Sequence, residues 1–340
     1  MKQYAPIVIP TLCRYEHLLN CIESLLKNSG VAKTELYISV DYPARDNHWI
    51  GYNRILKYIE TIKGFKKVHI LKCEKNKGAI ENSNYLLEYV SREHDRFIFT
   101  EDDNVFSPAF IEFMNQALEI VQKNDKLIGV CGYAYPFLAR KGEAETIQQG
   151  VAFPCWGYGM FFETRNKLRE YIKAGKLLVD FEVKREEVKR KSRYNYDLLV
   201  SACRAYPQTP DGEYYELMDL SLSAYMLINN KRTIMPTESL VRNCGWDGTG
   251  EHCKREEVKK KSVMLEYGYE KQKIYNGFEL NVNDVIDFEL DMEKLWYEYT
   301  KEYKNIKKRI ELWIKEKSYF LLGRNNYIFF KRKLIIFHNK

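Results

Sequence analysis

Short apolar runs alternate with helical patterns over the first hundred residues of the chain. Four runs have the length and composition of buried strands: residues 7–9, 36–40, 68–71 and 97–99. Leucine and isoleucine recur at helical spacing from Leu18 to Leu26, and residues 79–90 repeat that pattern before the fourth run. Strands that alternate with helices predict an α/β fold with a mostly parallel sheet flanked by helices.

Polar residues stand where each of these strands is predicted to end. Ligands bind outside the carboxyl ends of strands in such sheets, so a site is expected there. The residues in question are Pro10, Thr11 and Arg14, then Asp41, then Asn76, Lys77 and Gly78, and finally Glu101, Asp102 and Asp103. The agreement between topology and residue type predicts one functional site at this edge of the sheet.

The pattern loosens after residue 105. Helices are predicted at 108–121 and 213–228, and a buried strand at 127–131. The highly charged stretch 180–195 is expected to be an exposed helix or loop. Basic and aromatic helical patterns begin near residue 255, where we place a soft domain boundary, because no repeat or low-complexity linker marks a sharper one.

Composition narrows the choice of partner and compartment only in part. The net charge of +7 suits nucleotides, nucleic acid or acidic lipid headgroups. The chain opens without a secretory pattern, and no apolar stretch approaches the roughly 20 residues of a spanning helix. The eight cysteines include no CxxC pair, so reduced thiols and a cytoplasmic location are expected. Cys244, His252 and Cys253 lie close together, but a four-ligand zinc spacing does not accompany them.

Glu101, Asp102 and Asp103 directly follow an apolar strand. Adjacent carboxylates repel one another, so a cation is expected beside them. Mg²⁺ or Mn²⁺ fits, since such ions bind one or two carboxylates together with substrate phosphates. The alternative is a solvated acidic turn or a helix cap ahead of Ser107 and Pro108. The position after a buried strand favours the metal site.

The order of these motifs resembles the nucleotide-sugar half of glycosyltransferases with the A-type fold. The opening of the chain is similar to bacterial glycosyltransferase family 2. The Glu-Asp-Asp triplet followed by residues 106–110 resembles the animal N-acetylglucosaminyltransferase that starts complex N-glycans. The likeness covers about residues 5–250. It implies a catalytic domain over 1–254, with a nucleotide-sugar half (1–104) and an acceptor half (105–254), followed by a helical, basic and aromatic extension over 255–340.

The resemblance also implies roles for the matched residues. Pro10, Thr11 and Arg14 would border the nucleotide base and diphosphate, and Asp41 would accept a hydrogen bond from uracil or ribose. On residue type alone, Asp41 is equally well a turn or cap residue, and Arg14 a solvated cation of the first helical turn.

The remaining matched residues complete the donor and metal sites. Asp102 would lie by the ribose, Asp103 would bind the metal, and Glu101 with the loop of Asn76, Lys77 and Gly78 would belong to the donor-binding set.

Inverting sugar transfer needs a general base for the acceptor hydroxyl and charge stabilisation on the leaving diphosphate. The resemblance implies an acidic residue on a helix after the aromatic–glycine loop, and Glu213, Glu216 and Asp219 are the candidates. Asp219 is favoured because it opens the most regular part of the predicted helix. It is equally well an ordinary first-turn carboxylate that the helix dipole stabilises.

Two loops complete the predicted site. Trp156 and Gly157 would form a wall around the donor sugar, because glycine lets a backbone approach a ligand closely. The alternative is a core tryptophan beside a turn. His252, at the end of the Gly-rich stretch 243–252, would contact the metal or the diphosphate, although a lone histidine is more often a surface or packing residue.

These features predict an inverting, metal-dependent transferase that moves a sugar from a nucleotide donor, expected to be UDP, to a glycan or lipid-linked acceptor in bacterial surface polysaccharide synthesis. A sugar nucleotidyltransferase also uses a strand-end acidic pair and a metal, but residues 9–14 lack its usual Gly-rich signature. A non-enzymatic nucleic-acid-binding protein leaves the acidic triplet unexplained, so no nucleic-acid partner is expected.

Residues 301–340 combine many lysines and arginines with aromatic and aliphatic side chains. Ile306, Ile310, Trp313 and Ile314 fall at helical spacing with cations between them. This pattern is typical of an interfacial membrane segment and predicts peripheral association with an anionic surface at the inner face of the cell membrane. The alternatives are packing on the catalytic domain or a homo-oligomer interface.

Overall fold

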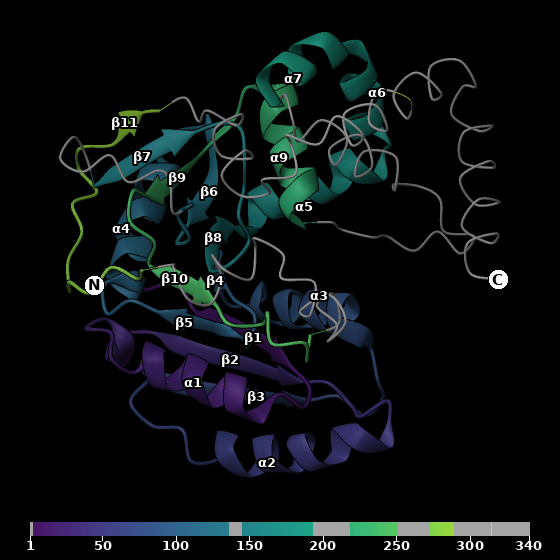
Figure 1. Cartoon of the computed structure of the whole chain (residues 1–340), viewed down its shortest axis with the longest axis vertical. Coiled ribbons are helices and arrows are strands. Elements are labelled where there is room, and N and C mark those ends of the chain that lie inside the picture. The colour runs from purple at the N-terminus through teal and green to yellow at the C-terminus, as the bar shows by residue number, and fades with distance from the viewer. Residues whose placement is uncertain (1–2, 136–144, 193–217, 251–272, 289–313, 315–340) are drawn as a thin grey trace.

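The computed structural model describes residues 3–135, 145–192, 218–250, 273–288 and 314 (Figure 1). A nine-stranded sheet runs through the molecule in the order β11–β7–β9–β6–β8–β4–β1–β2–β3. Its strands are β1 Ile7–Thr11, β2 Glu35–Val40, β3 Lys67–Lys72, β4 Arg96–Phe99, β6 Leu127–Cys131, β7 Thr146–Gln149, β8 Tyr158–Phe161, β9 Arg232–Pro236 and β11 Ile286–Asp287.

The first four strands are all parallel, with β1 paired between β2 and β4. β8 then runs antiparallel between β4 and β6, and β7 runs antiparallel to β9. A separate antiparallel pair joins β5 (Asn104–Phe106) to β10 (Val241–Asn243). The carboxyl ends of β1 to β4 therefore meet at one edge, and β5 with β10 lies directly after the acidic triplet.

Both faces of the sheet are covered, because successive residues of a strand point to opposite sides. Ile7 and Ile9 of β1 pack with helices α1 (Tyr15–Leu25), α2 (Trp49–Ile59) and α4 (Phe110–Gln122). Val8, between them, packs on the other side with α3 (Gly78–Val90) and α5 (Phe162–Lys173). Burial on both faces explains why the first strands read as continuous apolar runs.

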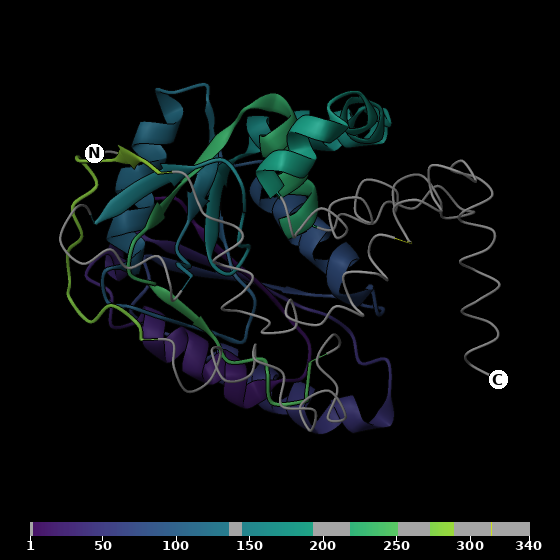
Figure 2. The same cartoon turned by 45° about the horizontal axis from the view of Figure 1, so that its top comes forward.

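A smaller helical layer forms a third core beyond the large sheet. It consists of α6 (Lys176–Val183), α7 (Arg185–Ser192), α9 (Met218–Asn229) and the end of α5. Figures 1 and 2 both show these helices gathered at one end of the molecule. Gly175 connects α5 to α6 with a φ of 69°, a conformation that glycine adopts without strain. Two single-turn 3₁₀ helices, η1 (Val31–Lys33) and η2 (Asp46–His48), complete the elements.

The predicted fold class is confirmed for the described ranges: a mostly parallel sheet flanked by helices. All four predicted early strands are present, as are the helices expected before β2, before β4 and before β6. The charged stretch from residue 180 is helical, as α6 and α7. Residues 273–288, which fall within the predicted extension, supply β11 to the large sheet. The rest of that extension, apart from Ile314, lies outside the described residues, and the boundary after residue 254 stays a prediction.

Within the part of the chain that the structure describes, no helix is both long enough and apolar enough to cross a membrane.

Candidate active site

The parallel strands bring the residues after β1 and the residues after β4 into direct contact. The Thr11 hydroxyl donates a hydrogen bond of 2.7 Å to Oδ2 of Asp102. The Arg14 guanidinium donates to Oδ1 of Asp102 and lies 2.8 Å from Oδ2 of Asp103. Both aspartates are buried, and the Arg14 side chain is about four-fifths buried, at 22% exposure. The structure thus joins four of the predicted site residues in one hydrogen-bonded group.

The far side of Asp103 is held by the strand pair β5–β10. Asn243 lies opposite Asn104 in that pair and donates a 2.9 Å hydrogen bond to Oδ1 of Asp103. The Cys244 amide donates to the Asp103 carbonyl oxygen at 2.8 Å. Gly245 packs so closely that a β-carbon there would stand 2.2 Å from Oδ2 of Asp103. Asn243 and Gly245 belong to the Gly-rich stretch 243–252, but their contacts with Asp103 were not predicted, because neither residue belongs to the strand-end motifs.

Asp41 is buried at 3% exposure, and the loop after β3 surrounds its carboxylate. Oδ1 accepts the backbone amides of Tyr42 and Lys77, at 2.8 and 2.9 Å. Oδ2 accepts the Gly78 amide at 2.9 Å and the Asn76 side-chain amide at 3.2 Å. Asp41 therefore caps the start of α3 and fixes the loop 76–78. Its predicted hydrogen bond to a nucleotide base or ribose stays a prediction.

The other residues of the strand-end loops face different surroundings. Lys77 pairs with Glu81 at 3.1 Å, and its ammonium lies 4.9 Å from the centre of the Tyr85 ring. Gly78 has a φ of 76°, and a β-carbon there would meet nothing within 4 Å. Pro10 is a half-buried member of β1, paired with Ser39. Backbone amides, through their hydrogen bonds to Asp41, therefore help to fix this end of the sheet together with the side chains.

Electrostatics at the acidic triplet favour a bound cation. Desolvation and the charges of Asp103, Asp102 and Asp219 raise the pKa of Glu101 to about 8, against the opposing charge of Arg14. Desolvation also raises the pKa of Asp103, although Arg14 opposes the shift. Burial alone would lower the pKa of Arg14, but the two aspartates raise it. Arg14 therefore pairs with two of the three carboxylates, and the excess negative charge of the triplet destabilises the ionised forms of Glu101 and Asp103.

Asp219, at the start of α9, belongs to the same electrostatic group, because its charge contributes to the raised pKa of Glu101. Its side chain and that of Glu101 both reach solvent. Desolvation by the surrounding protein nevertheless raises the pKa of Asp219, against its own hydrogen bond from the Leu220 amide at 2.8 Å. A carboxylate with a raised pKa that touches solvent is suited to accept a proton.

A hydrogen bond fixes the helix that carries Asp219 to the aromatic loop. The Phe153 amide donates to the Ser223 hydroxyl at 2.9 Å, and Ser223 lies one helical turn after Asp219. Among the predicted site residues, Glu216 and His252 lie outside the described part of the chain, as does the further candidate Glu213. The choice between Glu216 and Asp219 therefore stays a prediction.

The aromatic loop before β8 contributes one face to this region. Trp156 is half-buried and packs edge-on against Tyr133, with ring centres 4.7 Å apart, and against Trp246 at 6.4 Å. Gly157 has a φ of 66°, and a β-carbon there would press against Val241 and Phe110 at 2.9 and 3.1 Å. Gly157 is thus required by core packing, and its contact with a donor sugar stays a prediction.

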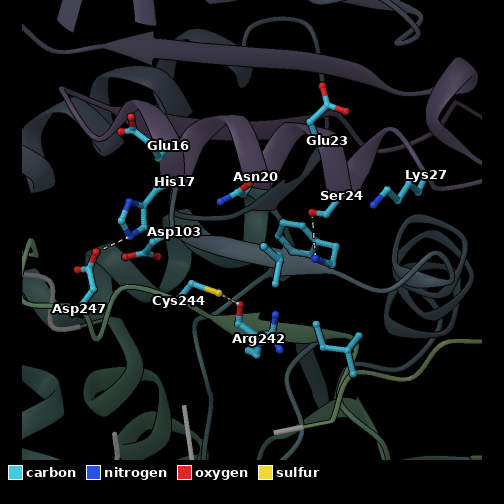
Figure 3. A pocket seen from close by; sticks show the side chains of 13 residues that line it. Glu16, His17, Asn20, Glu23, Ser24, Lys27, Asp103, Arg242, Cys244 and Asp247 are labelled. Atoms are coloured by element: carbon cyan, nitrogen blue, oxygen red, sulfur yellow. Dashed lines mark hydrogen bonds and ion pairs between the residues drawn. The ribbon is translucent and has the colours of Figure 1, made fainter. Parts of the chain in front are cut away.

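A cavity of about 680 Å³ lies between α1 and the strand pair β5–β10. Figure 3 shows His17 and Asn20 of α1 facing Arg242 and Cys244 across it, with Asp103 at its wall. His17 Nε2 lies 3.2 Å from Oδ2 of Asp247. Asp103 is the one predicted site residue in the described ranges that lines this cavity. The other predicted site residues that the structure describes lie outside the cavity lining, so we place the candidate active site at the carboxyl edge of the sheet.

The donor groups at this edge fit a divalent metal ion of the Mg²⁺ or Mn²⁺ type. They are carboxylate oxygens, which such hard ions prefer, and they carry an excess of negative charge. The described residues include no ready cluster of three or more His, Cys, Asp or Glu ligands. An ion here would rely on one or two carboxylates, with Asp103 the best placed, and on substrate oxygens for the rest.

Comparison with known proteins decides the family. The family described as Glycosyl transferase family 2 matches residues 7–177, which is half of the chain. The chain belongs to glycosyl transferase family 2. The match covers β1 to β8 and the start of α6, so it contains the whole strand-end site of this glycosyltransferase. The expected resemblance to family 2 is thereby confirmed.

Solved structures are similar to parts of this glycosyltransferase at low identity. TarS from S. aureus is 16% identical over 42% of this chain and 24% of its own, with a TM-score of 0.29. A second TarS structure, in complex with UDP, is 13% identical over 44% of this chain and 35% of its own, with a TM-score of 0.27. The mannosyltransferase PcManGT from Pyrobaculum calidifontis, with GDP-Man and Mn²⁺, is 12% identical over 49% of this chain and 47% of its own, with a TM-score of 0.36.

This glycosyltransferase therefore spans less than half the length of each of these three proteins. No curated protein matches it in sequence.

Proposed function

We propose that the protein is an inverting, metal-dependent glycosyltransferase that moves a sugar from a nucleotide donor, UDP-linked, to a hydroxyl group of a glycan or lipid-linked acceptor. The observation that carries the proposal is the meeting of Asp102, Asp103 and Arg14 at the carboxyl edge of the sheet, with Asp219 acting electrostatically on the adjacent Glu101. This arrangement offers a place for a cation beside a diphosphate and, separately, a base for the acceptor.

Each side chain then has a defined task. Asp103 would hold the ion, which neutralises charge on the leaving diphosphate when bound. Thr11 keeps Asp102 in place through its 2.7 Å hydrogen bond, and Asp41 keeps the loop 76–78 in place, where the nucleotide would bind. Asp219 would take the proton from the acceptor hydroxyl. Glu101 lies beside the two aspartates, and desolvation together with their charges raises its pKa.

The stereochemical course tests this mechanism. One base and no assigned nucleophile beside the donor predict inversion at the anomeric carbon. The product of transfer from a UDP-sugar, followed by proton NMR at early times, should show the opposite anomeric configuration to the donor. Retention would contradict both the inverting mechanism and the role of Asp219. If Glu216→Gln, rather than Asp219→Asn, abolishes turnover, Glu216 is the base.

We also propose a role in bacterial surface polysaccharide synthesis, with the enzyme in the cytoplasm and held at the inner membrane face through residues 301–340. The support is the basic and aromatic pattern of that segment, which apart from Ile314 lies outside the described residues. Sedimentation with anionic vesicles tests it. The full chain should pellet and a chain that ends near residue 300 should not. Equal behaviour of the two would instead favour packing on the catalytic domain or self-association.

A further inference from the structure

We propose that Arg14 is a resident cation that occupies the carboxylates of the metal site, gives up Asp103 when a divalent ion binds, and then pairs with the donor diphosphate. The inference rests on the proposed function, because it assigns a residue to the exchange of metal and donor at the same site. It makes Arg14 a competitor of the ion and a partner of the nucleotide.

Arg14 bridges the two aspartates of the acidic triplet. Arg14 uses one terminal nitrogen for Oδ1 of Asp102 and the other, at 2.8 Å, for Oδ2 of Asp103. Each of the other two oxygens accepts one hydrogen bond, since Thr11 donates to Oδ2 of Asp102 and Asn243 donates to Oδ1 of Asp103. An ion that binds Asp103 through Oδ2 would therefore compete with the guanidinium for that oxygen.

The acidic triplet can carry more negative charge than Arg14 neutralises. Glu101, Asp102 and Asp103 carry three potential negative charges, and Arg14 is the cation bonded to the two aspartates. A guanidinium and a divalent ion on the same carboxylate repel each other, and burial leaves little water to screen that repulsion. Arg14 therefore lowers the affinity of the site for an ion that arrives without a nucleotide.

Arg14 needs a new anionic partner once an ion takes its place at Asp103. It stands at the N-cap of α1, and its side chain is 22% exposed, so the side chain is not fully enclosed by the protein. Anions bind at helix N-termini, and guanidinium pairs with phosphate oxygens through two parallel hydrogen bonds. A diphosphate that enters with the ion would thus supply the partner that Arg14 loses at Asp103.

Removal of Arg14 should have opposite effects on the two ligands, which a purely structural role would not produce. In Arg14→Met, Mn²⁺ added alone should bind more tightly by roughly tenfold or more, the scale on which a neighbouring unit charge changes the proton affinity of a carboxylate. UDP added at saturating Mn²⁺ should bind more weakly, by a similar factor, because one phosphate partner is gone. If Arg14 only held the fold together, its loss would weaken both.

Mn²⁺ binding is measured by the EPR signal of the free ion, and UDP binding by calorimetry, on the full chain. Arg14→Lys keeps the charge but cannot span two carboxylates, so its Mn²⁺ affinity should lie between those of the wild type and Arg14→Met. Arg92→Met serves as a matched control, since Arg92 is exposed and lies over the Tyr89 ring, away from the site. Asp103→Ala should bind no Mn²⁺ at this site, and circular dichroism checks that each variant is folded.

Unchanged or weaker Mn²⁺ binding in both Arg14→Met and Arg14→Lys would overturn the proposal, as would Mn²⁺ binding that survives in Asp103→Ala. If Arg14→Met binds Mn²⁺ more tightly but binds UDP with unchanged affinity, the proposed pairing of Arg14 with the donor diphosphate is wrong. Failure of the proposed function gives a different result. If Arg14→Met gains Mn²⁺ affinity but the wild type turns over no nucleotide sugar, the exchange stands and the transferase assignment fails.

Discussion

Gly245→Ala tests the contact that holds Asp103 from behind. A β-carbon at this position would stand 2.2 Å from Oδ2 and 2.9 Å from Cγ of Asp103, whereas real β-carbons essentially never come within 3.0 Å of another heavy atom. The loop and the carboxylate must therefore separate by about 1 Å. The substitution adds no strain of another kind, because the φ of Gly245 lies outside the left-handed region.

The expected cost follows from this overlap. Forcing one methyl group into a packed site typically costs about 1–3 kcal/mol of unfolding free energy. A displacement of about 1 Å in a positioning group can also lower kcat/KM on the order of 100-fold. We therefore expect Gly245→Ala to lower the urea midpoint and to weaken Mn²⁺-dependent turnover far more than its small size suggests.

A double-mutant cycle with Asp103→Ala isolates the contact. Without the carboxylate, the nearest remaining atom would be Oδ1 of Asn243 at 3.4 Å, an ordinary van der Waals distance. Gly245→Ala should then cost much less stability in the Asp103→Ala background than in the wild type. An equal cost in both backgrounds, measured by urea unfolding, would refute the claim that Gly245 is required by Asp103.

Two further predictions concern single carboxylates. Asp219→Asn should leave Mn²⁺-dependent UDP affinity unchanged in calorimetry and lower kcat on the order of 10²–10⁴-fold, because it removes the proposed base; full activity would exclude Asp219. At Glu35, desolvation is outweighed by hydrogen bonds from Lys66 and His69, which lower its pKa to about 2. The resulting stabilisation is complete above roughly pH 5 and is lost as the pH falls towards 2, so Glu35→Gln should lower the urea midpoint at pH 7 and less at pH 3. An equal loss at both pH values would contradict this.

The sequence predicted the half of the fold in which strands are long and buried on both faces. β1 to β4 read clearly because their apolar runs are continuous, and parallel pairing then fixes which strand ends meet. That is why Thr11, Arg14 and Asp102 could be assigned to one site from positions about ninety residues apart. β5 and β10 contain three residues each, too few for a period to be recognised, and so the contact of Asn243 with Asp103 was not predicted.

Other features depend on contacts that a linear pattern does not contain. Helix α2 was not predicted. It packs against the loop after β1 because Gly51 has no side chain: a β-carbon there would lie 1.8 Å from the Cys13 carbonyl oxygen. From the sequence, Asp41 could be either a nucleotide contact or a turn or cap residue. Its position opposite the amides of Lys77 and Gly78 depends on the pairing of β2 with β3, which residue type alone does not reveal. A glycine inside an amphipathic helix is the one sequence signal that could have indicated the close contact of Gly51 with Cys13.

Release of UDP from a panel of UDP-sugars is the measurement that tests the central claim most directly. The purified wild type should hydrolyse or transfer at least one donor with Mn²⁺ present, lose that activity in EDTA, and regain it when the ion is restored. Asp103→Ala should remain inactive at every Mn²⁺ concentration and should lose Mn²⁺-dependent UDP binding. Equal turnover in EDTA, or full Mn²⁺-dependent UDP affinity in Asp103→Ala, would contradict the account.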